Sequence, residues 1–162
     1  NRFVPGKLAA DIKQTKPFKH LEEEAFLNLL RTADALTQRE EGMLDGYGLS
    51  HSQYNVLRIL RGAGAEGLPC GEIANRMITR DPDITRLLDR LERRGMAQRS
   101  RESKDRRVVT ARITQTGMDL LGTMDEPMVD TLKHLLEHLG QKDLKTLIEL
   151  LERARETAHL RP

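Results

Sequence analysis

The chain has 162 residues, of which 32% are charged and only 3% are aromatic. This composition disfavours a sheet-rich protein, because sheets prefer β-branched and aromatic residues, and it favours one domain of solvated helices around an aliphatic core. A single cysteine excludes an internal disulfide, and no apolar run reaches the roughly 20 residues that span a bilayer, so we expect a cytoplasmic protein without a membrane partner.

The N-terminal part of the chain predicts an arm followed by a long helix. Residues 1–19 contain prolines, a glycine and scattered lysines, and they predict weak local structure. A helix is predicted over about 21–44, because apolar residues recur there at i, i+3, i+4 and i+7. Gly46 and Gly48 end it. The apolar side of this helix comprises Phe26, Leu29, Leu30, Ala33 and Leu36.

The second helix has a clear start. Ser50 is predicted as its N-cap, and Gln53 stands three residues later, where a capping box requires it. The helix is predicted to end at the Gly-Ala-Gly sequence of residues 62–64. A short helix follows over about 71–78.

The fourth helix is predicted to start at an acidic cap. Asp81 is the predicted N-cap, Pro82 fills the first helical position, and Asp83 complements the helix dipole. Gly95 is predicted to end the helix as its C′ residue. The buried stripe of this helix is Ile84, Leu87, Leu88 and Leu91.

After Gly95 the hydrophobic period changes from helical to alternating. Residues 96–114 predict a two-stranded β-hairpin, with the polar residues 102–106 in its turn. Thr114 is predicted to cap a helix that runs to about Leu139, and Pro127 is a potential kink within it.

Gly140 separates this helix from a last one, which carries Leu144, Leu147, Ile148 and Leu151. The predicted fold class is therefore mainly α with a small β-hairpin.

Positive charge is concentrated in one segment. Residues 76–112 contain 12 of the 27 basic residues but only 6 of the 25 acidic residues. A polyanion would therefore meet one strongly cationic surface on a nearly neutral protein. At about 100° per residue, the side of the fourth helix opposite its buried stripe consists of Thr85, Arg86, Asp89, Arg90 and Arg93.

The short helix, a turn at Thr79 and Arg80, and the capped fourth helix together predict a helix-turn-helix. A charged helix face alone is usually only a solvated surface, with ion pairs at i, i+4. Here a basic hairpin directly follows the basic helix. Because both elements have shapes that fit DNA grooves, the pair favours DNA binding.

The expected roles follow from base and phosphate chemistry. Arg86 matches guanine O6 and N7, and Thr85 matches a thymine methyl or a base edge. Asp83 can accept from cytosine N4, although a capping role also explains it. Arg90 and Arg93 lie further along the helix and are better suited to phosphates, which position the protein without specifying sequence.

The hairpin turn extends the cationic surface. Lys104, Arg106 and Arg107 can reach beyond the helix toward a minor groove, where the negative potential is strongest. Asp105 is expected to pair with a nearby arginine and to fix the turn. The predicted DNA-contacting residues are Thr79, Asp81, Asp83, Thr85, Arg86, Arg90, Arg93, Lys104, Asp105, Arg106 and Arg107.

Four segments in this order resemble the MarR family of bacterial transcriptional regulators. They are GLSHSQYNVLRIL, GEIANRM, DITRLLDRLERRGMAQR and DRRVVTARITQTG, and the resemblance covers about residues 21–160. The family's wing signature is present as Asp105-Arg106-Arg107, followed by an alternating strand that ends in Ile-Thr-x-x-Gly. Ile113 replaces the usual leucine.

The resemblance implies a homodimer in which the N- and C-terminal helices join two winged helix-turn-helix lobes. It also implies that Arg107 probes the minor groove while Asp105 braces the wing. The apolar stripes of the terminal helices agree with pairing, since they need cover. The expected division is an arm at 1–19, a lobe at about 49–114, and dimerisation helices at about 20–46 and 115–160.

Other chemistry-bearing residues give weaker signals. Cys70 stands at a helix N-terminus, which can lower a thiol pKa, but a lone cysteine is more often a packed residue. His134 and His138 have metal-pair spacing, yet no further ligand completes a site, and we interpret them as surface histidines. His51 falls where the resemblance implies a crevice for aromatic carboxylates or phenols, or it is simply an early helix residue.

The sequence thus predicts a homodimeric, sequence-specific regulator that binds a pseudo-palindromic operator in double-stranded DNA. In this family such a protein is more often a repressor, with affinity altered by a small aromatic effector. The alternative is a winged-helix module that binds proteins rather than specific DNA. No cofactor or metal is expected. An enzyme is disfavoured, because no phosphate loop, metalloprotease motif or nucleophile–base order stands out.

Overall fold

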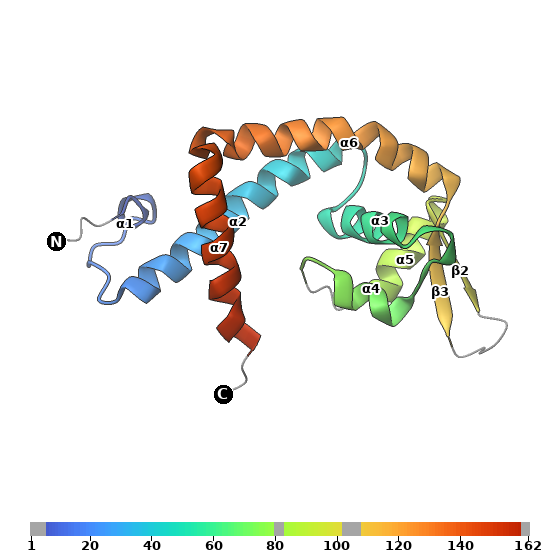
Figure 1. Cartoon of the computed structure of the whole chain (residues 1–162), viewed down its shortest axis with the longest axis horizontal. Helices are drawn as coiled ribbons and strands as arrows, with labels where there is room; N and C mark the ends of the chain where they lie inside the picture. Colours follow the sequence, from blue (N-terminus) through green and yellow to red (C-terminus); the bar gives the residue numbers. More distant parts are fainter. Residues whose placement is uncertain (1–5, 80–82, 102–107, 160–162) are drawn as a thin grey trace.

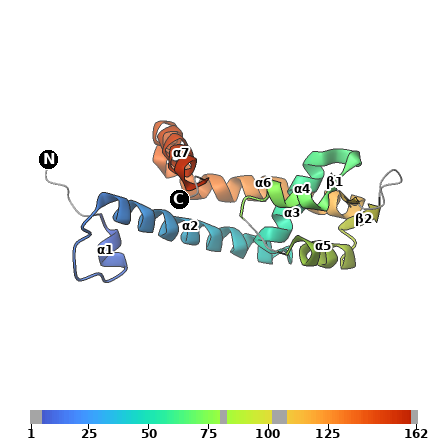
Figure 2. The ribbon, with the colours of Figure 1, turned by 90° about the horizontal axis from the view of Figure 1, so that it is seen from below.

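The computed structural model describes residues 6–79, 83–101 and 108–159. Figure 1 shows a small lobe at one end and long helices, the arms, that lead away from it. The lobe comprises α3 (His51–Ala63), β1 (Leu68–Pro69), α4 (Cys70–Arg76), α5 (Ile84–Arg93), β2 (Ala97–Arg101) and β3 (Val109–Ile113). The arms are α2 (Leu21–Asp45), α6 (Gln115–Leu136) and α7 (Gly140–Glu156). The view from below in Figure 2 shows α2 and α6 along the long axis of the molecule.

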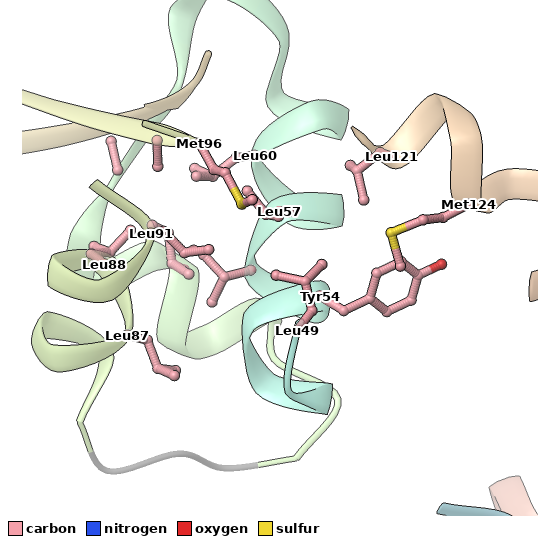
Figure 3. Packing of buried hydrophobic residues seen from close by; sticks show 14 of the residues in the cluster. Leu49, Tyr54, Leu57, Leu60, Leu87, Leu88, Leu91, Met96, Leu121 and Met124 are labelled. Carbon is pink, nitrogen blue, oxygen red and sulfur yellow. The ribbon is translucent and has the colours of Figure 1, made fainter. Parts of the chain in front are cut away.

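The hydrophobic core lies in the lobe and in the adjoining ends of α2 and α6. Figure 3 shows α3, α5 and α6 side chains that point toward one another, with the Tyr54 ring beside Met124. The largest fully buried side chains are Leu44, Val56, Leu57, Leu60, Ile73, Leu88, Leu91, Leu121 and Met124. Because each such side chain contributes about 1.5–3 kcal/mol when it leaves water, this cluster holds the lobe together.

The predicted caps of α3 and α6 are confirmed. The Gln53 backbone N–H donates to Ser50 Oγ over 3.2 Å, and the Ser50 N–H donates to Gln53 Oε1 over 3.0 Å, which completes the capping box. The Gly117 N–H donates to Thr114 Oγ1 over 3.2 Å at the start of α6. Local sequence therefore sets both starting points.

The predicted cap of α5 is wrong by two residues. The N-cap is Asp83, not Asp81, because Asp83 is the residue with a non-helical backbone whose Oδ1 accepts the Arg86 N–H over 2.9 Å. The helix begins at Ile84, which is partly buried and packs against the core. Two aspartates lie close together here, and a cap pattern alone does not distinguish them.

The predicted hairpin is part of a three-stranded antiparallel sheet. Strand order is β1-β3-β2, with Ala97 opposite Ile113 and Leu68 opposite Ala111. The hairpin itself is confirmed as β2 and β3. The third strand, β1, was not predicted, because its two residues are too few for an alternating pattern. Residues 102–106, the predicted turn, lie outside the described residues.

Other predicted bounds hold with small shifts. The first long helix is α2, which is one residue longer than predicted. The N-terminal segment before it contains a short helix, α1 (Leu8–Asp11). The predicted helix 71–78 is α4, which ends at Arg76 because Met77 has an extended backbone. Helix α6 continues through Pro127 and is followed by a 3-10 turn at Glu137–Leu139.

The arms expose apolar side chains. No residue of α7 is buried, and Ile148 is 54% exposed. On α2, Phe26 is 60% exposed and Leu30 is 53% exposed. None of the helices in the described ranges combines the length and apolar character that crossing a membrane requires.

Candidate nucleic-acid interface

The candidate interface is the outward face of α5, which consists of Thr85, Arg86, Asp89, Arg90 and Arg93. Leu87, Leu88 and Leu91 are buried on the opposite side of this helix, as the sequence predicts. On the outward face, every side chain except that of the half-buried Asp89 is exposed. The buried leucines therefore fix the orientation of α5 and turn its arginines toward solvent.

Arg86 is an exposed cation near the N-terminal end of this face. Its side chain is 71% exposed, and its Nε lies 3.4 Å from Oδ2 of Asp83, which also caps the helix. An exposed pair of this kind contributes little to stability, so Arg86 can exchange it for another acceptor. Arg93 instead donates from Nε to the Asp89 carbonyl oxygen over 3.3 Å.

The structure locates six of the predicted contact residues. All six are exposed. They are Thr79 in the turn before α5, Asp83 at its cap, and Thr85, Arg86, Arg90 and Arg93 in the helix. The remaining five predicted residues, Asp81, Lys104, Asp105, Arg106 and Arg107, lie outside the described residues.

A buried polar side chain fixes the turn before α5. Oδ1 of Asn55, on α3, accepts the Ile78 backbone N–H over 2.8 Å, and Asn55 is only 9% exposed. Such a bond orients the turn, because leaving a buried amide without a partner costs about 1–3 kcal/mol. No sequence pattern singled out Asn55. The available signal was an amide side chain among the apolar residues Tyr54, Val56 and Leu57.

A second missed residue, Arg99, joins β2 to α5. Its Nε donates to Glu92 Oε2 over 2.9 Å, and its Nη2 bonds to both Glu92 Oε2 and Asp89 Oδ1. The Arg99 backbone N–H also donates to Glu92 Oε1 over 2.7 Å. These bonds raise the pKa of Arg99 and lower the pKa of Glu92 below its usual value. The guanidinium thus pairs with two carboxylates of one helix.

The two residues that follow α5 bond to residues beside two of the arms, α2 and α6. The Arg94 guanidinium donates to the Gly48 and Tyr47 carbonyl oxygens, which follow α2. Thr114 Oγ1, at the start of α6, donates to the Gly95 carbonyl oxygen over 2.6 Å. The orientation of α5 is therefore coupled to the orientation of the arms.

An open groove of about 630 Å³ lies between α2 and α6. Its walls are formed by Arg39, Met43, Asp130, Thr131, His134 and Leu135. It combines apolar surface with a guanidinium, an imidazole and the Asp130 carboxylate. The apolar side chains and the guanidinium suit an aromatic anion, whereas the carboxylate opposes one. His51, the other histidine considered from sequence, bonds through Nδ1 to Glu40 Oε2 over 2.7 Å.

The remaining candidate groups show no reactive or metal-binding arrangement. Burial raises the pKa of the Cys70 thiol, which disfavours the reactive thiolate. His134 is exposed and lies 3.8 Å from Glu137. Across the ranges that the structure describes, no group of three potential metal ligands occurs.

Comparison with known proteins identifies the fold and the family. The MarR family model matches residues 49–109. A MarR transcription factor of Planctomyces limnophilus is 41% identical, with 83% of this chain and 98% of that chain covered and a TM-score of 0.65. The transcriptional regulator YfiV of Bacillus subtilis is 33% identical over 68% of this chain and 69% of its own length.

A more distant structure extends the comparison of the fold. Sco3205, a MarR family regulator of Streptomyces coelicolor solved in complex with DNA, has a TM-score of 0.77 over 91% of this chain and 94% of that chain. At 23% identity this likeness concerns the fold alone. The matches at 41% and 33% identity reach well beyond the helix-turn-helix, and these relatives are transcriptional regulators rather than enzymes. The chain therefore belongs to the MarR family of transcriptional regulators.

Proposed function

We propose that this regulator binds double-stranded DNA sequence-specifically, with the outward face of α5 in the major groove. The observation that carries the proposal is the exposure of Thr85, Arg86, Arg90 and Arg93 on a helix anchored by buried leucines. Arg86, near the N-terminal end of α5, would read a guanine, and Thr85 would contact a thymine methyl or a base edge. Arg90 and Arg93 would hold phosphates.

The basic segment that follows β2 would extend this interface. Lys104, Arg106 and Arg107 would reach an adjacent minor groove, with Asp105 as their brace. Their part in the proposal rests on their charge and on their position in the sequence between β2 and β3.

The active form would be a homodimer. Phe26 and Leu30 on α2 and Ile148 on α7 are exposed apolar residues, and a second copy of the same chain is the commonest cover for such surfaces. A two-fold dimer would bind a pseudo-palindrome whose half-sites lie about one helical turn apart. Its site of action would be the cytoplasm, where bacterial operator DNA is found.

An effector would act by favouring one dimer spacing over another. The groove between α2 and α6 offers Arg39 and His134 to a carboxylate and Met43 and Leu135 to a ring. A ligand shifts DNA affinity only if it binds one arrangement of the arms better than the other. We propose a small phenolic or aromatic acid as effector and repression as the usual output.

Selection of duplexes from a random pool tests the proposal directly. The wild-type protein should enrich a pseudo-palindromic sequence, and the affinity for it should fall steeply with salt as phosphate contacts release counterions. A protein-interaction module would enrich no sequence. Repeating the selection with 4-hydroxybenzoate tests the effector. This acid should release the selected duplex from the wild-type protein. It should not release the duplex from Arg39→Ala.

Two substitutions separate base contacts from phosphate contacts. Arg86→Ala should relax the preference at one base position, because a bidentate guanine contact is lost. Arg93→Ala should weaken all duplexes alike and reduce the salt dependence. If both variants kept the wild-type sequence preference and affinity, the outward face of α5 would not be the contact surface.

A further inference from the structure

The outward face of α5 contains one acidic residue among its cations. Asp89 stands four residues after Thr85 and four residues before Arg93, so these three side chains follow one another along the helix. The Asp89 side chain is 46% exposed, compared with 29% for Glu92 on the flank of the same helix. A carboxylate at the position of Asp89 would face any polyanion bound to α5.

Arg99 pairs with both carboxylates from β2. Its side chain is only 23% exposed, and it bonds to Asp89 Oδ1 through Nη2. Its contacts with Glu92 are more numerous, and they include the Arg99 backbone N–H. Most bonds between Arg99 and α5 are therefore made with Glu92, on the flank of the helix. The bond to Asp89 lies on the outward face, where it also changes the local charge.

We propose that Arg99 is a positioning residue for DNA binding, which holds the Asp89 carboxylate in an ion pair so that the outward face of α5 presents unopposed cations to phosphates. This inference rests on the proposed DNA-binding function. The physical reason is Coulombic: a carboxylate close to a phosphate repels it, and an ion pair within bonding distance cancels most of that repulsion.

The test uses a duplex selected from the random pool by the wild-type protein. Arg99→Gln removes the cation and should weaken binding to this duplex by about tenfold or more. Two double variants restore the wild-type net charge: Asp89→Asn with Arg99→Gln, and Glu92→Gln with Arg99→Gln. They differ only in which carboxylate is left without its arginine.

Recovery should depend on position. The Asp89→Asn double variant should bind within about threefold of wild type, whereas the Glu92→Gln double variant should stay as weak as Arg99→Gln. Equal recovery by both would mean that only net charge matters, and recovery by neither would mean direct contact or a purely structural role. Either outcome would overturn the inference, as would an Arg99→Gln protein with unchanged affinity.

Folding and the underlying function are controlled separately. Circular dichroism and thermal unfolding establish that each variant is folded at the assay temperature. If Arg99→Gln is not, Arg99→Met takes its place with the same second substitutions, because methionine also removes the cation and its long side chain can replace the packing of the arginine stem. The same pattern of recovery is expected. Failure of the wild-type protein to select any duplex would refute the proposed function itself, whereas a lost recovery pattern refutes only the role of Arg99.

Discussion

The lobe and the arms differ in how they cover their apolar side chains. Helix α5 has ten residues and buries Leu87, Leu88 and Leu91, whereas α7 has seventeen residues and buries none. The lobe thus completes a core within one chain. The arms carry apolar side chains that the same chain leaves exposed. We therefore expect the stability of the arms to depend on a second copy of the chain, and the stability of the lobe to depend on its own core.

The largest expected effect is a cavity in the lobe. Leu88→Ala removes a side chain that is 0% exposed and should lower the free energy of unfolding by about 2–5 kcal/mol. Chemical denaturation at several protein concentrations measures it. The matched change Leu30→Ala, at a residue that is 53% exposed on α2, should cost little on dilution, where the protomers separate, and more at high concentration, where pairing stabilises the folded wild-type chain. Similar losses at every concentration for both would break the comparison.

A charge on the exposed face of α7 should separate the protomers without unfolding the lobe. Ile148→Glu places a carboxylate where a 54% exposed isoleucine stands, and it should weaken dimerisation tenfold or more, which is about 1.4 kcal/mol or above. Sedimentation at a series of concentrations measures the dissociation constant. Glu149→Gln, the adjacent exposed position, is the control that should leave it unchanged. A fully dimeric Ile148→Glu protein would exclude this face from the interface.

Loss of the α3 cap should destabilise the lobe by a smaller amount. Ser50→Ala removes the oxygen that accepts the Gln53 N–H and should cost about 1 kcal/mol, measured by denaturation. Ser52→Ala in the same helix has no capping role and should be nearly neutral. Because α7 has no side-chain cap, this prediction sharpens the contrast between the two regions. Equal costs for the two serines would contradict it.

The smallest effect concerns the contact between lobe and arm. Arg61 on α3 bonds bidentately to Asp125 on α6 over 2.9 Å and lowers the Asp125 pKa. A depressed pKa means that the stabilisation is present above the unfolded-state value and is lost as pH falls through the lower folded-state value. Since Asp125 is 49% exposed, we expect less than about 1 kcal/mol.

Denaturation of Asp125→Asn and wild type at several pH values tests this pairing. The two proteins should differ slightly at neutral pH and converge as the pH falls below about 4, the ordinary range of an aspartate. Divergence toward low pH would mean that the pair does not stabilise the lobe against α6.

Much of the fold follows from local patterns. The apolar period predicts α2, α3, α5, α6 and α7, and the caps at Ser50 and Thr114 set two starting points correctly. The same kind of evidence failed at Asp81, because two nearby aspartates both suit a cap and only the bond from the Arg86 N–H to Asp83 selects one. The proposed division into a lobe at about 49–114 and dimerisation helices stays a prediction.

The sequence by itself determined the order of the helices, the basic segment and the side of α5 that carries Arg86, because each depends on periodicity or on charge along the chain. Only the tertiary structure decided the pairing of β1 with β3, the bond between Asn55 and Ile78, and the contact of Arg99 with Asp89 and Glu92. Hydrogen bonds and ion pairs act over a few ångströms between residues far apart in the chain, so their partners are set by packing rather than by spacing. The acidic and basic residues of α5 can be read from the sequence. Only the packing of β2 against α5 shows that Arg99 pairs with Asp89, the carboxylate on the outward face of that helix.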